Sequence, residues 1–505
     1  MNIDTLSIKS IKESANLTAQ QNIDADIILP DYYDTIGKIL KSELKPVVEA
    51  ITSSGDKISI AGIAKFTLHY LGEDNKMYCY ENEYRYTKVF QSQFAESCIS
   101  TRASQTVFSL NCRAIAPKRI ELRAVLQVGI KIKAENNSML ISEIDDSSVI
   151  SRSETLSFIS AVNSVSRTFS LSSSFPLNDY NDNIDIIIRK DSRIKIQEIK
   201  TIHNKAYIKG IAETEILYYS NSSGNTSATV LSLPLSEIID VFGAEEDDIC
   251  NVIINDVYTE IIIKNNDAEN QSLDIRIDIN LQADVSRNIT GNILADVYSI
   301  KNEIYTEKDT VELITSSKKV SKTENIIFET DIYDESKLSV MDCWVSNIKI
   351  SSEKHGSRYN LLTTASFNAL IKNEYGNLSI ISREHTFESE LIAENTESAT
   401  DIIDCQVLSI QALQTQGGKI RFTSELLFST DIHTIRKVTG FTNITVNEEA
   451  RCENSAKFII YFAKENEVIW DVAKENKTTV DAIKQLNSIS GDILTEDKML
   501  VLPSF

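Results

Sequence analysis

Glycine and proline are scarce in this chain. Among 505 residues there are only 15 glycines and 6 prolines, well below the average shares of about 7% and 5%. Most turns must therefore be made by Asn, Asp and Ser, whose side chains bond to their own backbone and tolerate unusual φ angles. The shares of hydrophobic residues (42%) and charged residues (25%) are ordinary for a folded protein, so the chain can bury a core.

Positive charge is also in short supply. There are 51 Lys and Arg residues against 73 Asp and Glu residues, which gives a formal net charge of −22, and no basic run offsets it locally. Such a surface repels phosphate groups. We therefore expect no nucleic acid partner and no binding to anionic membrane surfaces.

Long apolar runs are absent too. The first residues, MNIDTLSIKSIKESANLTAQQ, contain no apolar stretch of signal-peptide length. No run reaches the roughly 18 apolar residues of a membrane span, so we expect none. The seven cysteines are scattered singly and odd in number. Together with the missing signal peptide, this favours reduced thiols in a cytosol over disulfides.

Motifs of catalysis and cofactor binding are missing. The chain contains no GxxxxGK[ST], GxGxxG, HExxH, GxSxG or CxxC, and its five histidines are far apart in sequence. We therefore predict no cofactor, no metal site and no catalytic residue, and we expect the chain not to be an enzyme. A hydrolase with two catalytic carboxylates stays open, because 73 acidic residues supply many pairs, but no feature supports it.

What the chain does contain is alternation of apolar and polar residues. Residues 273–285, LDIRIDINLQADV, place every second residue on one apolar side, and residues 120–132, IELRAVLQVGIKI, do the same. Alternation of this length predicts antiparallel strands with one buried and one solvated face. A helix would spread the aspartates of 273–285 around its whole circumference.

Such segments belong to a longer repeat. Residues 58–70, ISIAGIAKFTLHY, are similar to 206–219, AYIKGIAETEILYY, and to a degraded third copy at 359–371, YNLLTTASFNALI. The copies lie roughly 150 residues apart, which indicates duplicated domains rather than a solenoid of short repeats. The shared Gly62 and Gly210 indicate a bulge or a close packing contact rather than a ligand site.

The expected fold class is therefore mainly β. We predict three tandem β-sandwich-like modules at residues 1–150, 151–315 and 316–453, followed by a small α+β domain at 454–505. A barrel is the alternative for each β module. In the last domain, strands at 458–463 and 499–502 enclose two helices. The first helix covers 468–477, and the second begins after Thr478 as N-cap, which gives the order β-α-α-β.

This last segment resembles the LysM domain. The matching residues include Tyr461, the pair Ile469-Trp470 and the closing stretch Leu500-Val501-Leu502-Pro503. LysM domains usually bind glycans that contain N-acetylglucosamine, such as peptidoglycan and chitin, in a groove between the loop before the first helix and the loop after the second. The resemblance implies a glycan groove at Asn466, Glu467, Asn487, Ile493 and Asp497.

Two residues of this groove depart from the LysM pattern. Val468 stands where a small hydroxyl would face a sugar, and Asp497 replaces the usual glycine. An apolar residue beside a tryptophan suits a protein partner better than a sugar. We therefore predict a partner-binding surface made by Val468, Ile469, Trp470, Asp471 and Lys474. The alternative is that Trp470 is simply part of the LysM core.

The β repeats, the lead-in Leu29-Pro30 and the LysM tail together resemble the SipL-like coat morphogenesis proteins of anaerobic spore-formers. These proteins pair β repeats of the spore-coat (SPOCS) type with one C-terminal LysM domain. The resemblance implies a mother-cell scaffold without enzymatic activity, located in the mother-cell cytoplasm at the forespore surface and in the spore coat.

The partners that this resemblance implies are proteins. The LysM domain would bind the ATPase of the coat basement layer, stage IV sporulation protein A, and other coat proteins could follow. The alternative function is a LysM protein that binds peptidoglycan or chitin-type glycan in the cell wall or spore cortex, or a wall hydrolase targeted by its LysM domain. A hydrolase should carry a catalytic motif and a wall protein an export signal, and neither occurs in the sequence.

Overall fold

A computed structural model describes most of the chain, namely residues 2–95, 98–146, 148–176, 184–220, 224–267, 270–332, 337–392, 398–400, 403–416, 418–451 and 458–503. These residues fold almost wholly into antiparallel strands, with two short helices between the last two strands. This confirms the predicted mainly β class with a β-α-α-β domain at the end.

The strands form three units of the same topology. The first unit contains β1 (Asn2–Ile28), β2 (Ile36–Ser54), β3 (Lys57–Gly72), β4 (Met77–Gln91), β5 (Cys98–Ala116) and β6 (Arg119–Asp145). Its strands form two sheets of order β1-β6-β5 and β2-β3-β4. Side chains from both sheets enclose one apolar core, as in a β-sandwich.

The second and third units repeat this arrangement. The second contains β7 (Val149–Pro176), β8 (Ile186–Ile202), β9 (Lys205–Ser220), β10 (Asn225–Asp240), β11 (Ile249–Asp267) and β12 (Asn270–Ser299). The third contains β13 (Asn302–Asp331), β14 (Leu338–His355), β15 (Arg358–Asn373), β16 (Leu378–Ile392), β17 (Ser398–Thr400), β18 (Asp404–Thr415) and β19 (Lys419–Arg451). The sheet orders are β11-β12-β7 with β10-β9-β8, and β13-β19 with β14-β15-β16, where β17 and β18 both pair with β19.

The module boundaries expected at residues 150 and 315 fall inside strands β7 and β13, and the one expected at 453 lies outside the described residues. The second and third units each begin with a long strand directly after a short turn. No linker of distinct composition marks the change.

The repeated glycine lies opposite a bulge in each of the first two units. Gly62 of β3 pairs with Val48, where the register of β2 shifts, and Gly210 of β9 pairs with Ile196, where the register of β8 shifts. A Cβ at Gly210 would lie 2.4 Å from the carbonyl oxygen of Lys195, so no side chain fits there. The glycines are therefore packing residues of the sheets.

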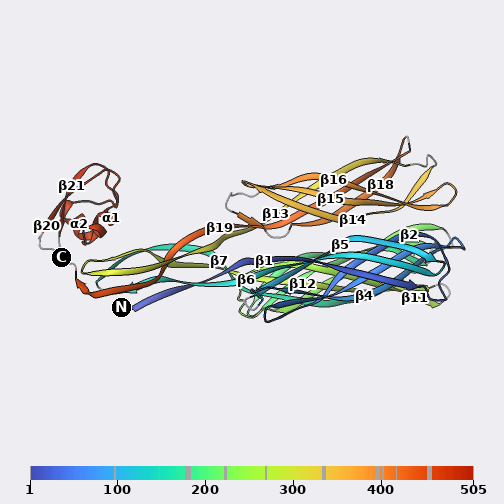
Figure 1. Cartoon of the computed structure of the whole chain (residues 1–505), viewed down its shortest axis with the longest axis horizontal. Coiled ribbons are helices and arrows are strands. Elements are labelled where there is room, and N and C mark those ends of the chain that lie inside the picture. Colours follow the sequence, from blue (N-terminus) through green and yellow to red (C-terminus); the bar gives the residue numbers. More distant parts are fainter. Residues whose placement is uncertain are drawn as a thin grey trace.

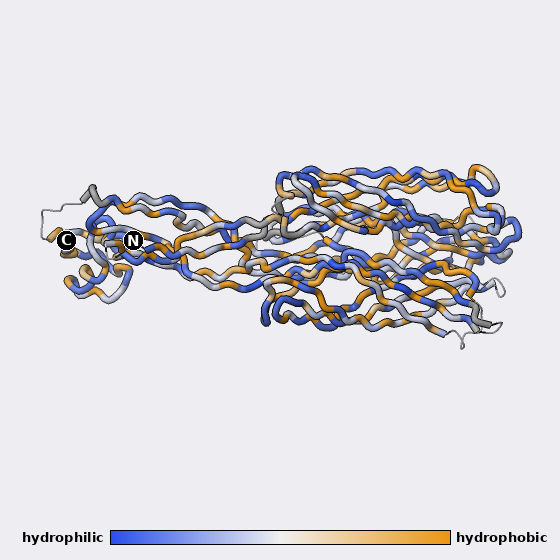
Figure 2. Tube along the Cα trace, turned by 90° about the horizontal axis from the view of Figure 1, so that it is seen from below, coloured by the Kyte–Doolittle hydropathy of each residue, from blue (hydrophilic) through white to orange (hydrophobic). Residues whose placement is uncertain are grey.

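The outer sheets extend beyond the sandwiches as two-stranded ribbons. These ribbons comprise 2–13 with 133–145, 149–161 with 286–299, and 302–314 with 435–451. They pack side by side into a narrow stalk that projects from the wider body of the three sandwiches (Figures 1 and 2). One buried cluster of the stalk draws side chains from all three ribbons: Ile8, Leu140, Leu156, Phe158, Ile293, Val311, Leu313 and Val438.

Within the body, the three inner sheets share a second apolar cluster, formed by Leu40, Met77, Ile188, Leu217, Leu370 and Leu378. Polar bonds join the units around it. The Nζ of Lys38 donates to the carbonyl of Leu378, and the Nζ of Lys372 donates to the carbonyl of Gly224, both at 2.9 Å. The three units therefore form one elongated assembly within a single chain.

The small domain lies at the tip of the stalk (Figure 1). Strands β20 (Phe458–Ala463) and β21 (Lys498–Pro503) pair, and helices α1 (Ile469–Glu475) and α2 (Val480–Asn487) lie between them in sequence. The N-cap of α2 is Thr479, whose side chain accepts a hydrogen bond from the Ala482 N–H at 3.1 Å, so the expected cap at Thr478 is wrong by one residue. Thr478 instead donates its N–H to the Ala473 carbonyl at the end of α1.

Candidate functional site

The small domain is fixed to the stalk by a shared core. Tyr298, at the end of β12, is 3% exposed and packs among the core residues of the domain, which include Ile469, Val472, Ala473 and Ile483. Its hydroxyl donates to the carbonyl of Thr478 at 2.8 Å. Burial, followed by the charge of Asp296, raises the pKa of Tyr298 to about 12, so this hydroxyl stays protonated and able to donate.

Trp470 of α1 completes this contact. Its ring meets the ring of Tyr298 edge to face at a centroid distance of 5.2 Å, and the guanidinium of Arg152 lies 5.4 Å from its ring. Its Nε1 donates to Oδ2 of Asp296 at 2.8 Å. Both the apolar ring and the polar N–H of Trp470 thus have their contacts within this chain.

Asp296 of β12 is the polar centre of the contact. Its carboxylate also accepts from Nζ of Lys474 at 2.7 and 2.9 Å, and its side chain is only 17% exposed. Burial acts to raise the pKa of Asp296, but the hydrogen bonds from Lys474 and Trp470 outweigh it and hold the pKa below its ordinary value. Asp296 is therefore ionised when the LysM domain is packed against the stalk.

The structure separates the five residues predicted to bind a partner. Ile469 is fully buried in the domain core, whereas Asp471 is exposed. Trp470 and Lys474 face the stalk, and Val468 forms a β-bridge with Ile493. They form no continuous free surface, because successive residues of a short helix point in different directions.

The two loops expected to flank a glycan groove are joined by backbone hydrogen bonds. Asn466 N–H donates to the carbonyl of Leu494 at 2.8 Å, and Leu494 N–H donates to that of Glu467 at 3.0 Å. Asn466, Ile493 and Asp497 are exposed and Glu467 is partly buried. Asp497 stands where the LysM pattern has glycine. Its carboxylate accepts a hydrogen bond from the Glu465 N–H at 2.8 Å and so stabilises the loop.

Asn487 has a different role from the other expected groove residues. Its Nδ2 donates to the carbonyls of Ile483 and Val501, both at 2.8 Å, and its Oδ1 accepts from Val501 N–H at 2.7 Å. The side chain therefore ties the end of α2 to β21. Asn487 is a structural residue of the domain.

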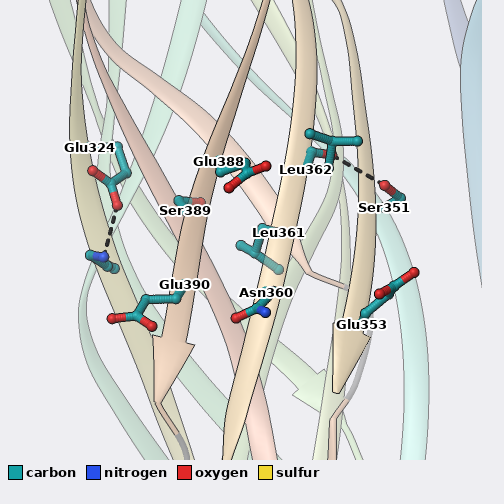
Figure 3. A pocket seen from close by; sticks show the side chains of 10 residues that line it. Glu324, Ser351, Glu353, Asn360, Leu361, Leu362, Glu388, Ser389 and Glu390 are labelled. Carbon is teal, nitrogen blue, oxygen red and sulfur yellow. Dashed lines mark hydrogen bonds and ion pairs between the residues drawn. The ribbon is translucent and has the colours of Figure 1, made fainter. Parts of the chain in front are cut away.

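A cavity lies far from this domain, between the two sheets of the third unit (Figure 3). It has a volume of about 550 Å³ and is lined by Glu324, Glu353, Glu388 and Glu390 among others. Glu324 pairs with Lys322 at 2.9 Å and Glu390 with Arg358 at 3.4 Å. Nowhere in the described part of the chain are three His, Cys, Asp or Glu side chains grouped to hold a metal ion.

The sequence did not indicate the roles of Asp296, Tyr298 and Arg152. These residues belong to the second β unit and contact the LysM domain. The sequence did show an acidic residue inside the apolar stretch ILADVY, residues 293–298. Nothing in that stretch indicates that Asp296 would bind Trp470 and Lys474. The helices of the described segments are all too short or too polar to span a membrane.

Comparison with known families identifies two modules. A model described as SipL, SPOCS domain, matches residues 183–269, which include β8 to β11 of the second unit, and a LysM domain model matches residues 462–503. Neither a curated protein nor a solved structure matches the chain. The chain thus carries a SipL-type SPOCS domain together with a LysM domain, as expected of a sporulation-related LysM protein and as its sequence resemblance indicated.

Proposed function

We propose that the chain is a non-enzymatic scaffold of spore coat assembly. In this function its LysM domain binds the coat basement-layer ATPase, stage IV sporulation protein A, and the chain tethers the coat to the forespore from the mother-cell cytoplasm. The matched modules are both of non-catalytic type. Other coat proteins are further partners in this proposal.

One observation carries the proposal. The LysM domain is held at the tip of a long stalk by Asp296 and Tyr298, while three β-sandwiches form the opposite end of the molecule (Figure 1). Such an arrangement holds the LysM domain at a fixed distance from the three sandwiches, which is what a tether requires. An enzyme would instead need a convergent set of reactive side chains in a closed pocket.

The competing function is binding of peptidoglycan or chitin-type glycan. It is favoured by the exposure of Asn466, Ile493 and Asp497 at the expected groove. Peptidoglycan binding requires hydrogen-bonding groups directed at sugar hydroxyls, and Val468 supplies none at the position where a hydroxyl is usual.

Two assays on the purified full chain separate these functions. The first measures binding to purified stage IV sporulation protein A by interferometry, and the second measures co-sedimentation with insoluble peptidoglycan. We expect saturable binding to the ATPase and no co-sedimentation. Co-sedimentation without ATPase binding would overturn the scaffold proposal in favour of the glycan function.

A further inference from the structure

The outer face of the LysM sheet is apolar and uncovered. Phe458, Ile460 and Phe462 of β20 point outward and are 58%, 61% and 75% exposed. On β21 they pair with Pro503, Val501 and Met499, and Met499 is 55% exposed. Three successive cross-strand pairs thus present only apolar side chains, and we call these six residues the distal face.

The distal face has no role in the fold of the domain. The core is built from the opposite side of the same strands, where Ala463, Leu500 and Leu502 are buried. Contact with the stalk is made by α1 and the turn after it, through Trp470 and Lys474. The sheet therefore lies on the side of the domain away from these contacts, at the end of the molecule (Figure 1).

A contiguous apolar surface of this kind marks a site of association. An antiparallel sheet with helices on one face usually leaves a polar second face to solvent. Here the second face is apolar, and none of the described residues of the chain covers it. Sugars need hydrogen-bonding partners, and the six side chains of the distal face offer none. The surface therefore fits an apolar protein surface.

The negative charge of the chain limits which partners can bind the distal face. The chain has a net charge of −22, which opposes a second copy and an anionic lipid surface alike. At the end of the distal face near Phe462 and Met499, the exposed Glu465, Glu496 and Asp497 outnumber the exposed Lys464. The complementary surface is apolar with basic residues at its margin.

We propose that the distal face is the surface through which the LysM domain binds the coat ATPase, an inference that rests on the function proposed above. The contact is made by the apolar pairs of β20 and β21, and the expected surface around Trp470 instead holds the domain on the stalk. Phe462, the most exposed of the six side chains, is its main anchor.

The test compares variants of the full chain in binding purified stage IV sporulation protein A. We expect Phe462→Ser to weaken binding by ten- to a hundredfold, as is usual for a large aromatic side chain at an interface hot spot. Met499→Lys, which places a charge on the same face, should weaken it similarly. Leu486→Ser is the matched control, because Leu486 is 49% exposed on α2 of the same domain, and it should bind as the unchanged chain does.

Hydrogen exchange of residues 458–503 shows whether each variant keeps the domain folded. If a folded Phe462→Ser or Met499→Lys variant binds the ATPase as tightly as the unchanged chain, the distal face is not the contact surface and the scaffold function stands. Equal weakening by Leu486→Ser would also overturn the assignment. If the unchanged chain itself fails to bind the ATPase, the proposed function and this inference fall together.

Discussion

At the scale of single residues, Asn487 shows how a polar side chain expected at a binding groove can instead stabilise the fold. The Asn487→Ala change removes three hydrogen bonds and leaves Val501 N–H without its acceptor. We expect the LysM domain to lose about 2–4 kcal/mol of stability. Hydrogen exchange of 458–503 in the full chain measures this loss. Gln485→Ala, at an exposed position of the same helix, is the control, and equal exchange in both variants would contradict the structural role.

Val468 supports a second prediction at this scale. A sugar hydroxyl that faces valine loses its water without gaining a partner, which costs about 1–3 kcal/mol. We expect the full chain to bind an N-acetylglucosamine oligomer weakly or not at all by calorimetry, and Val468→Ser to bind about tenfold more tightly. Low-micromolar affinity of the unchanged chain, with NMR shifts clustered at 466–470 and 489–497, would restore the glycan function.

At the scale of elements, the contact between α1 and β12 fixes the LysM domain. Asp296→Ala leaves the Trp470 N–H and the Lys474 ammonium without their acceptor. We expect docking to weaken by about 2 kcal/mol, a moderate value because Lys474 is partly exposed. Faster hydrogen exchange at 469–478 and an altered X-ray scattering profile would report it. Asp278→Ala, on the solvent face of β12, should leave both measurements unchanged.

The same contact should respond to acid. Hydrogen bonds hold the pKa of Asp296 below its ordinary value in the docked state, so docking is favoured above the pKa of the free carboxyl, about 3.9, and is lost as pH falls through the docked pKa. We expect exchange at 469–478 to accelerate below about pH 4. Asp296→Asn cannot titrate and should show a flatter profile; an identical acid response in both chains would refute the assignment.

Local elements could be predicted from sequence because their cause is local. The apolar residues of 273–285 alternate with polar ones, and all of them are at most 2% exposed in β12. The site could not be predicted in the same way. Asp296 and Trp470 are 174 positions apart, and neither has a sequence context that names the other. The same limit explains why Trp470 was expected on a free surface.

At the scale of the whole molecule, His69 lies where the first two units meet. It is 3% exposed, and its Nε2 donates to the carbonyl of Ile187 in β8 at 3.1 Å. Burial, and then the charge of Lys41, lowers its pKa to about 4, against the opposing effect of Glu43 and Glu81. The interface therefore holds neutral imidazole.

A group whose pKa falls on folding stabilises the fold above its unfolded pKa, about 6.5, and that stability is lost as pH falls toward about 4. We expect the melting temperature of the full chain to decline across this range, and less steeply in His69→Gln. His355→Gln is the control, since that side chain is 65% exposed. Equal slopes in the unchanged chain and in His69→Gln would contradict this role.

The stalk could not be anticipated at this scale. Its ribbons continue the same alternation that forms the sandwiches, so no change of pattern marks where β13 leaves the body, and the boundary expected at 315 falls within that strand. Which ribbons pack together depends on the docking of three units. That docking depends on contacts between residues far apart in the chain, such as Ile8, Phe158 and Val438, which share one buried cluster.

The ribbons of the stalk also determine how the molecule carries load. With a rise of about 3.3 Å per residue, a ladder of roughly 13 pairs spans about 40 Å between body and LysM domain. Its hydrogen bonds lie perpendicular to the strands. A pull on the tip, directed along the axis, therefore strains many bonds of β12 and β7 at once instead of opening them one by one. The stalk therefore resists extension, because a pull along its axis loads the hydrogen bonds of the ladder in shear.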